Sequence, residues 1–230
     1  MKLAFALALL VAIPAAAQQT GTVAAPVAGQ PTGDRWEKEM SAFEAADRAT
    51  PFPKGGIVFV GSSTIRQWDV ATYFPDLKIL NRGFGGSELA DAVRHVDRLV
   101  LKHEPRLVVV YAGDNDIAGG RLAEQVAVEF ERFVRAVHTR LPQTRILYLA
   151  IKPSILRWIQ IDRMRAANDL IRATCARDDR LGYVDFDSFM LGWDERPQPE
   201  LFVADGLHLS AQGYQLWSAV LRPLLLPQSY

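Results

Sequence analysis

Short apolar runs alternate with segments of helical spacing along most of this chain, and this alternation restricts the fold more than any other feature. The runs at 57–60 and 107–111 read Ile-Val-Phe-Val and Leu-Val-Val-Val-Tyr. Three more runs lie at 77–81, 146–150 and 183–186. Runs of this length without a polar face are typical of strands that are buried on both sides. Apolar side chains recur at helical spacing between and around them, near 36–48, 88–101, 122–141, 161–175 and 210–221.

Strands that alternate with helices predict right-handed crossovers and a parallel sheet. We therefore expect an α/β domain in which helices cover both faces of a five-stranded parallel sheet, a three-layer α/β/α sandwich of the flavodoxin-like kind. Ligands bind such folds at the carboxyl ends of the strands. Functional residues are expected directly after each strand.

The first residues have a different character. Lys2 precedes an apolar run at 3–13, and Pro14-Ala15-Ala16-Ala17 follows it. This order is typical of a secretory signal peptide, and the run is shorter than the ~20 apolar residues of a transmembrane anchor. We predict a signal peptide at 1–17, a flexible linker at 18–34 and one domain at 35–230. The mature protein is then expected in the periplasm or outside the cell.

Charge and cysteine content exclude several functions. The chain of 230 residues holds 26 basic and 26 acidic residues, so it lacks the basic excess of a nucleic-acid binder or a polybasic membrane-surface protein. Its single cysteine, Cys175, excludes an intramolecular disulfide and a multi-cysteine zinc site. After the N-terminal run, no stretch has 18 uncharged apolar residues, and we expect no stable insertion into a membrane.

Four short blocks carry residues suited to chemistry, and three of them start where a predicted strand stops. They are Gly61-Ser62-Ser63-Thr64-Ile65-Arg66, Asn81-Arg82-Gly83-Phe84-Gly85-Gly86-Ser87, Gly113-Asp114-Asn115-Asp116 and Asp205-Gly206-Leu207-His208. Because the strands are expected to be parallel, the blocks are predicted to meet at one edge of the sheet.

Together the blocks supply the parts that acyl transfer needs. Ser63 is placed to act as a nucleophile, His208 as its base and Asp205 as the group that orients the base. The backbone N–H groups of Ser63 and Gly86 and the Asn115 carboxamide supply donors for an oxyanion. Each part also fits an ordinary structural role: helix capping for the serines, turns for the glycines, loop hydrogen bonds for Asn115 and a loop pair for Asp205 and His208.

The four blocks in this order resemble the SGNH hydrolase superfamily, also called GDSL-type esterases and lipases, from about residue 57 to residue 221. The resemblance implies the flavodoxin-like fold, a catalytic Ser63 and His208, oxyanion residues Gly86 and Asn115, and no metal or organic cofactor. One position departs from the family pattern, because Ser62 replaces the usual aspartate. Two adjacent serines therefore compete for the nucleophile position, and alignment on Gly61 favours Ser63.

Charged residues gather near the predicted strand ends. Arg66, Arg82, Asp116 and Lys152 are candidates for binding a polar substrate group; they and Arg157 also fit ion pairs with one another and with Asp114. Three tryptophans, Trp68, Trp158 and Trp193, are candidates to line an acyl or sugar pocket, although core packing is expected for at least one.

These observations predict a serine esterase that cleaves a carboxylic ester through Ser63, His208 and Asp205. Arg82 and Asp116 favour a small or polar substrate, such as an acylated carbohydrate, over a long-chain lipid. Two alternatives stay open at this stage. The same site suits a carbohydrate O-acetyl esterase or an acyltransferase, and the replacement at Ser62 also fits a non-catalytic exported glycan-binding module.

Overall fold

A computed structural model describes residues 34–226 of the chain. The predicted signal peptide at 1–17 and nearly all of the linker at 18–34 lie outside the described residues, so both remain predictions. The strands are β1 (Ile57–Gly61), β2 (Ile79–Gly83), β3 (Leu107–Tyr111), β4 (Arg145–Leu149) and β5 (Leu181–Val184). The α-helices are α1 (Glu37–Ala49), α2 (Ser63–Arg66), α3 (Val70–Tyr73), α4 (Leu89–Arg94), α5 (Val96–Leu99), α6 (Asp114–Ala118), α7 (Ala123–Arg140), α8 (Ile161–Cys175), α9 (Asp187–Met190) and α10 (Ala211–Leu225).

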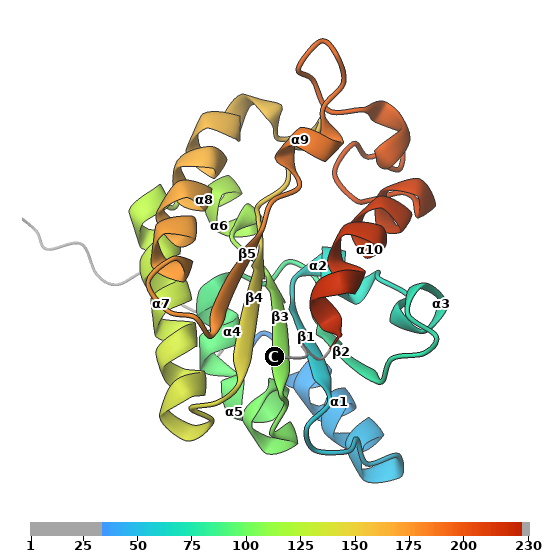
Figure 1. The fold of residues 1–230 in the computed structure, drawn as a ribbon, viewed down its shortest axis with the longest axis vertical. Coiled ribbons are helices and arrows are strands. Elements are labelled where there is room, and N and C mark those ends of the chain that lie inside the picture. The colour runs from blue at the N-terminus through green and yellow to red at the C-terminus, as the bar shows by residue number, and fades with distance from the viewer. Residues whose placement is uncertain (1–33, 227–230) are drawn as a thin grey trace, which may run out of the picture. The chain divides into compact units, whose positions relative to one another are not determined.

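The five strands form one parallel sheet in the order β2-β1-β3-β4-β5. This confirms the predicted α/β/α sandwich with a five-stranded parallel sheet. Consecutive side chains of a strand point to opposite faces of the sheet, so each strand contributes apolar side chains to two hydrophobic cores. Val58 and Val60 belong to the core under α4, α7 and α8, whereas Ile57 and Phe59 belong to the core under α10. Figure 1 shows α4, α7 and α8 on one side of the sheet and α2, α3 and α10 on the other.

Four of the five strands have bounds that differ from the predicted ranges by one or two residues. The difference that bears most on the predicted site residues is in β2, which extends through Arg82 to Gly83. A charged residue near the end of a run argues against a strand when only the sequence is read. Here Arg82 is tolerated because it forms an ion pair with Asp47 of α1. The predicted helix at 88–101 is divided at His95 into α4 and α5.

The last helix begins as predicted and ends later. Ser210 caps it, because its hydroxyl accepts a hydrogen bond of 3.2 Å from the N–H of Gly213. Beyond Leu221 the helix continues to Leu225 although Pro223 lies within it. Proline removes one backbone donor, and the Arg106 guanidinium supplies a partner for the helix end by donating to the carbonyl of Leu225 at 2.7 Å.

Candidate active site

The turn between β1 and α2 places Ser63 at the edge of the sheet. Gly61 has φ +150°, and a Cβ there would lie 1.9 Å from the carbonyl oxygen of Tyr111 on β3. Only glycine therefore fits where β1 ends. Ser62 is buried, while Ser63 is the half-buried first residue of α2. The first N–H groups of a helix have no partner within the helix, so the nucleophile candidate lies beside free backbone donors.

Helix α2 packs against the end of β2 with almost no space between the two backbones. A Cβ at Gly83 would lie 2.1 Å from the backbone nitrogen of Arg66. The Asn81 carboxamide donates to the carbonyls of Ile65 and Trp68 at 2.7 and 3.1 Å. These contacts explain why an asparagine and a glycine stand in the second block: they hold the short helix that starts with Ser63. Sequence reasoning did not assign Asn81 this role.

Ser63, His208 and Asp205 form one continuous hydrogen-bond chain. The Oγ of Ser63 lies 2.9 Å from Nε2 of His208, and Nδ1 of His208 lies 2.6 Å from Oδ2 of Asp205. A carboxylate at Nδ1 requires the ring proton there, which leaves Nε2 as the acceptor for the serine hydroxyl. Ser63 and His208, which are 145 positions apart in the chain, are thus joined in the way that a nucleophile and its base are. Ser62, the competing serine, has a buried side chain.

A tight turn at Asp205 holds the imidazole in place. One carboxylate oxygen of Asp205 accepts from the backbone N–H groups of Leu207 and His208 at 2.8 and 2.9 Å, while the other meets the ring. Gly206, with φ +65°, allows the chain to reverse inside this turn. The hydrogen bond from His208, with help from the two backbone donors, lowers the pKa of Asp205 to about 2. The carboxylate therefore keeps its charge throughout the neutral range.

The two predicted oxyanion residues follow β2 and β3. Gly86 has φ +79°, a conformation that favours glycine. A Cβ at this position would lie 3.5 Å from its nearest neighbour, a guanidinium nitrogen of Arg35, so the space beside Gly86 is open. Asn115 donates from Nδ2 to the carbonyl of Ser87 at 3.0 Å and accepts at Oδ1 from Arg157 at 3.1 Å. These two partners determine which end of the carboxamide is the donor. One of the two Nδ2 hydrogens remains for a third partner.

Comparisons with known proteins identify the family of this chain. The sequence profile of the GDSL-like lipase/acylhydrolase family matches residues 60–216, a range that contains all four blocks. The chain belongs to the GDSL-like lipase/acylhydrolase family. It is therefore a hydrolase that acts on ester bonds, and the predicted SGNH-type relationship is confirmed.

Individual relatives agree with the family assignment. The human platelet-activating factor acetylhydrolase IB subunit alpha1 is 30% identical over 203 residues, which cover 84% of this chain and 83% of the relative. A GDSL-like lipase from Bacteroides thetaiotaomicron has the same fold, with a TM-score of 0.69, 17% identity and coverage of 81% and 96% of the two chains. A carbohydrate esterase family 3 protein from Talaromyces cellulolyticus also shares the fold, with a TM-score of 0.59, 17% identity and coverage of 74% and 95%.

A buried charge cluster lies under the family's third block. The Asp114 carboxylate accepts from Nζ of Lys152 at 3.2 Å and from the Tyr111 hydroxyl at 3.2 Å, and it also pairs with Arg157. Lys152 further donates to Tyr111 at 3.0 Å. Burial alone would raise the pKa of Asp114, but Lys152 and Arg157 outweigh burial and lower it. Through Arg157 this cluster connects to the Asn115 carboxamide.

Three of the four predicted substrate-binding residues are not accessible to a substrate in this structure. Lys152 is 1% exposed and belongs to the cluster with Asp114, and Arg82 is 4% exposed and pairs with Asp47. Asp116 is 1% exposed and accepts from the N–H of Leu89, and burial together with Glu88 raises its pKa to about 6. Of the three, Lys152 pairs with Asp114 as the ion-pair alternative predicted, whereas Arg82 pairs with Asp47 and Asp116 accepts from a backbone N–H. Arg66 is exposed and lies against Gly85.

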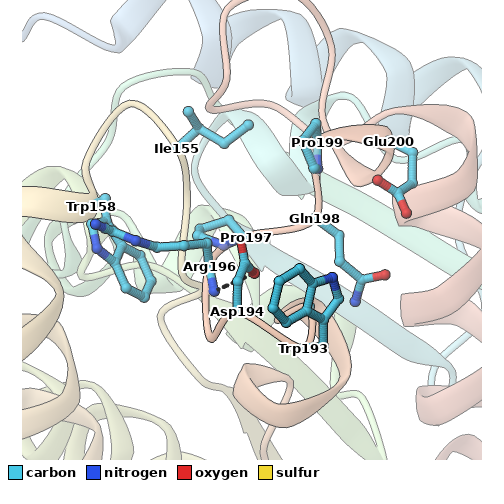
Figure 2. Close-up of a pocket in the computed structure, with 10 residues that line it drawn as sticks. Ile155, Trp158, Trp193, Asp194, Arg196, Pro197, Gln198, Pro199 and Glu200 are labelled. Atoms are coloured by element: carbon cyan, nitrogen blue, oxygen red, sulfur yellow. Dashed lines mark hydrogen bonds between the residues drawn. The ribbon is translucent and has the colours of Figure 1, made fainter.

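The three tryptophans divide between the two predicted roles. Trp68 is a core residue, packed edge-on against Phe59 and bonded through its indole N–H to Ser218 at 3.1 Å. Trp158 and Trp193 instead line an open cavity (Figure 2). Within residues 34–226, no three His, Cys, Asp or Glu side chains gather as metal ligands would, and no helix is long and apolar enough to cross a membrane.

Proposed function

We propose that the protein hydrolyses carboxylic esters through Ser63 as the nucleophile, His208 as the general base and Asp205 as the group that orients the base. The observation that carries this proposal is the chain of hydrogen bonds from Ser63 Oγ through His208 to Asp205, at 2.9 and 2.6 Å. Nucleophile, base and orienting group within hydrogen-bond reach are the signature of covalent acyl transfer.

In the first half-reaction, Ser63 Oγ bonds to the ester carbonyl carbon while Nε2 of His208 takes the hydroxyl proton. The carbonyl oxygen becomes an oxyanion, which the backbone N–H groups of Ser63 and Gly86 and Nδ2 of Asn115 stabilise. His208 then gives its proton to the leaving alcohol, and an acyl-serine remains. A water molecule activated by His208 releases the carboxylic acid and restores Ser63, so that ester and water become acid and alcohol.

A short acyl group is the favoured acid part of the substrate. The relative with 30% identity is named an acetylhydrolase, which supports acetyl or a similarly small group. Arg82 and Asp116, whose sequence positions favoured a polar alcohol part, are both buried. The hydrolysis rates of p-nitrophenyl acetate and of long-chain p-nitrophenyl esters test the expected acyl length. A strong preference for long chains would contradict it.

Labelling with a fluorophosphonate tests the nucleophile. Wild-type protein is expected to gain the probe's mass on the peptide that contains Ser63, and Ser63→Ala is expected to gain none. The neighbouring Ser62→Ala variant is the matched control and should still be labelled, because the side chain of Ser62 is buried and that of Ser63 meets His208. Labelling of Ser63→Ala at the wild-type level would contradict the assignment.

Asn115 provides a second test. Asn115→Ala should lower kcat by about 10²–10³-fold, because one preorganised oxyanion donor is lost. Asn115→Asp keeps the shape but replaces the donor with a negative oxygen, so it should be at least as impaired. The KM for a short ester should change little in both variants. A kcat within threefold of wild type in both would remove Asn115 from the mechanism.

A further inference from the structure

A cavity of about 660 Å³ opens at the edge of the sheet that carries His208, and the hydrolytic steps make no use of it. Two segments line it: Ile155 and Trp158 follow β4, and most of the loop from Gly192 to Glu200 follows β5 and α9. Its volume lies in the range of about 300–1,000 Å³ that is usual for small-molecule pockets.

The cavity borders the turn that holds His208. Ile155, one of its lining residues, lies 3.1 Å from the position that a Cβ on Gly206 would take. The next residue, Leu156, donates its backbone N–H to the carbonyl of Gly206 at 3.0 Å. Gly206 stands between Asp205 and His208 in the chain. The lining segment and the catalytic turn are therefore in direct contact.

This position corresponds to the alcohol part of an ester. His208 must give its proton to the leaving oxygen, so the alcohol has to lie on the His208 side of Ser63. In the proposed mechanism the carbonyl oxygen is held instead by the oxyanion donors, which include Gly86 and Asn115. A cavity next to the His208 turn is thus placed to hold the group that leaves.

Two indoles give the cavity flat apolar surfaces. Trp193 is 99% exposed, although burial of such a large apolar side chain is favourable. Figure 2 shows Trp158 and Trp193 on opposite sides of Arg196 and Pro197. An exposed tryptophan offers a face on which the C–H groups of a ring can stack, while its N–H remains a donor.

Polar side chains stand among these aromatic surfaces. Asp194, Arg196, Gln198 and Glu200 all line the cavity, which has Ile155 as its one aliphatic wall residue apart from prolines. Asp194 Oδ1 accepts from the N–H of Arg196, and Gln198 Nε2 donates to the carbonyls of Phe189 and Leu191. A hydrocarbon chain would desolvate the charges of Arg196 and Glu200 without giving them partners, whereas hydroxyl groups both donate and accept. The guanidinium of Arg196 lies 5.1 Å from the Trp158 ring centre, and this positive charge disfavours a quaternary ammonium ligand there.

We propose that this cavity binds a pyranose ring of the alcohol part, so that the protein removes short acyl groups from a saccharide. This inference rests on the proposed esterase function. The ring stacks on Trp193, and its hydroxyls bond to Arg196 and Glu200 and to the remaining polar atoms of Asp194 and Gln198. Hydrolysis then converts the acylated sugar and water into the free acid and a sugar whose hydroxyl is restored.

The kinetic test compares two acetates by acetate release, an O-acetylated methyl pyranoside and ethyl acetate. Trp193→Ala should lower kcat/KM for the sugar acetate about tenfold and leave ethyl acetate within twofold of wild type. Ile159 is 92% exposed, follows Trp158 in the chain and does not line the cavity, so Ile159→Ala is the matched control and should change neither value. Equal losses on both acetates would overturn the proposal.

A binding measurement separates this proposal from the esterase mechanism. In the Ser63→Ala variant, calorimetric titration with the acetylated pyranoside should show saturable binding, and Ser63→Ala/Trp193→Ala should bind about tenfold more weakly. Equal affinity of the two variants, or no binding to either, would overturn the subsite even if esterase activity is present. Undiminished turnover of ethyl acetate by Ser63→Ala would instead refute the proposed nucleophile and leave the subsite to be judged by the titration.

Discussion

Replacing His208 with alanine should lower kcat for a short ester by about 10⁴- to 10⁶-fold, as removal of the base does in other serine hydrolases. Without Nε2 at 2.9 Å, the Ser63 hydroxyl has no acceptor for its proton during attack. The leaving alcohol also loses its proton donor. Steady-state kinetics with an acetate ester measures the effect, and urea unfolding checks that the variant remains folded.

Two comparisons make the result specific to the hydrogen-bond chain. His138→Ala is the control, since His138 bonds to the carbonyl of Thr144 at 2.9 Å, and its kcat should stay within twofold of wild type. The double variant Ser63→Ala/His208→Ala should be no slower than either single variant, because the two residues act as a unit. A kcat above a tenth of wild type for His208→Ala would contradict the assignment.

Replacement of Asp205 is expected to lower kcat to the same extent throughout the neutral pH range. Its pKa is lowered to about 2, mainly by the hydrogen bond from His208, so the carboxylate is charged at every pH above that value. Asp205→Asn should therefore lose activity across the whole neutral range, by about 10⁴-fold, because the imidazole is then held in the wrong tautomer. Loss confined to one end of the pH profile of kcat would be inconsistent with this role.

The central strands β1, β3 and β4 were predictable because they are buried on both faces. The run at 107–111 is apolar throughout and became β3 with the predicted bounds. The boundaries moved where a strand includes residues that have no apolar character of their own. Arg82 in β2 is such a residue, since its partner Asp47 lies 35 residues away, and no local pattern identifies that pairing.

The candidate site was predictable to the extent that it follows strand ends. The topology predicted Ser63 and Asn115 at one edge of a parallel sheet, whereas His208 follows no predicted strand and was selected as a base for its chemistry. The structure brings Ser63 and His208 together. Charge, in contrast, gave a misleading signal. Lys152 has a sequence position that suits substrate binding, but its side chain turns inward to Asp114, 38 residues earlier. Whether a charged side chain faces solvent or a distant partner depends on contacts that one sequence does not display.

Lys152→Met is expected to lower the free energy of unfolding by about 3–5 kcal/mol, because it removes one partner of a buried ion pair. Lys152 is 1% exposed and donates to Asp114 and to Tyr111. Methionine fills a similar volume but leaves the Asp114 carboxylate with less positive charge around it. Urea denaturation of the purified variant measures the change.

The same substitution at an exposed ion pair is the control. Lys54 and Glu104 form a salt bridge at 2.6 Å with side chains 69% and 49% exposed, so Lys54→Met should change the free energy of unfolding by about 1 kcal/mol or less. In Lys152→Met/Asp114→Asn both charges are removed, and the loss should be smaller than the sum of the two single losses, since no buried carboxylate is then left without Lys152. If Lys152→Met is no more destabilising than Lys54→Met, the cluster around Asp114 does not stabilise the fold, and its contact with Asn115 through Arg157 would then be its main role.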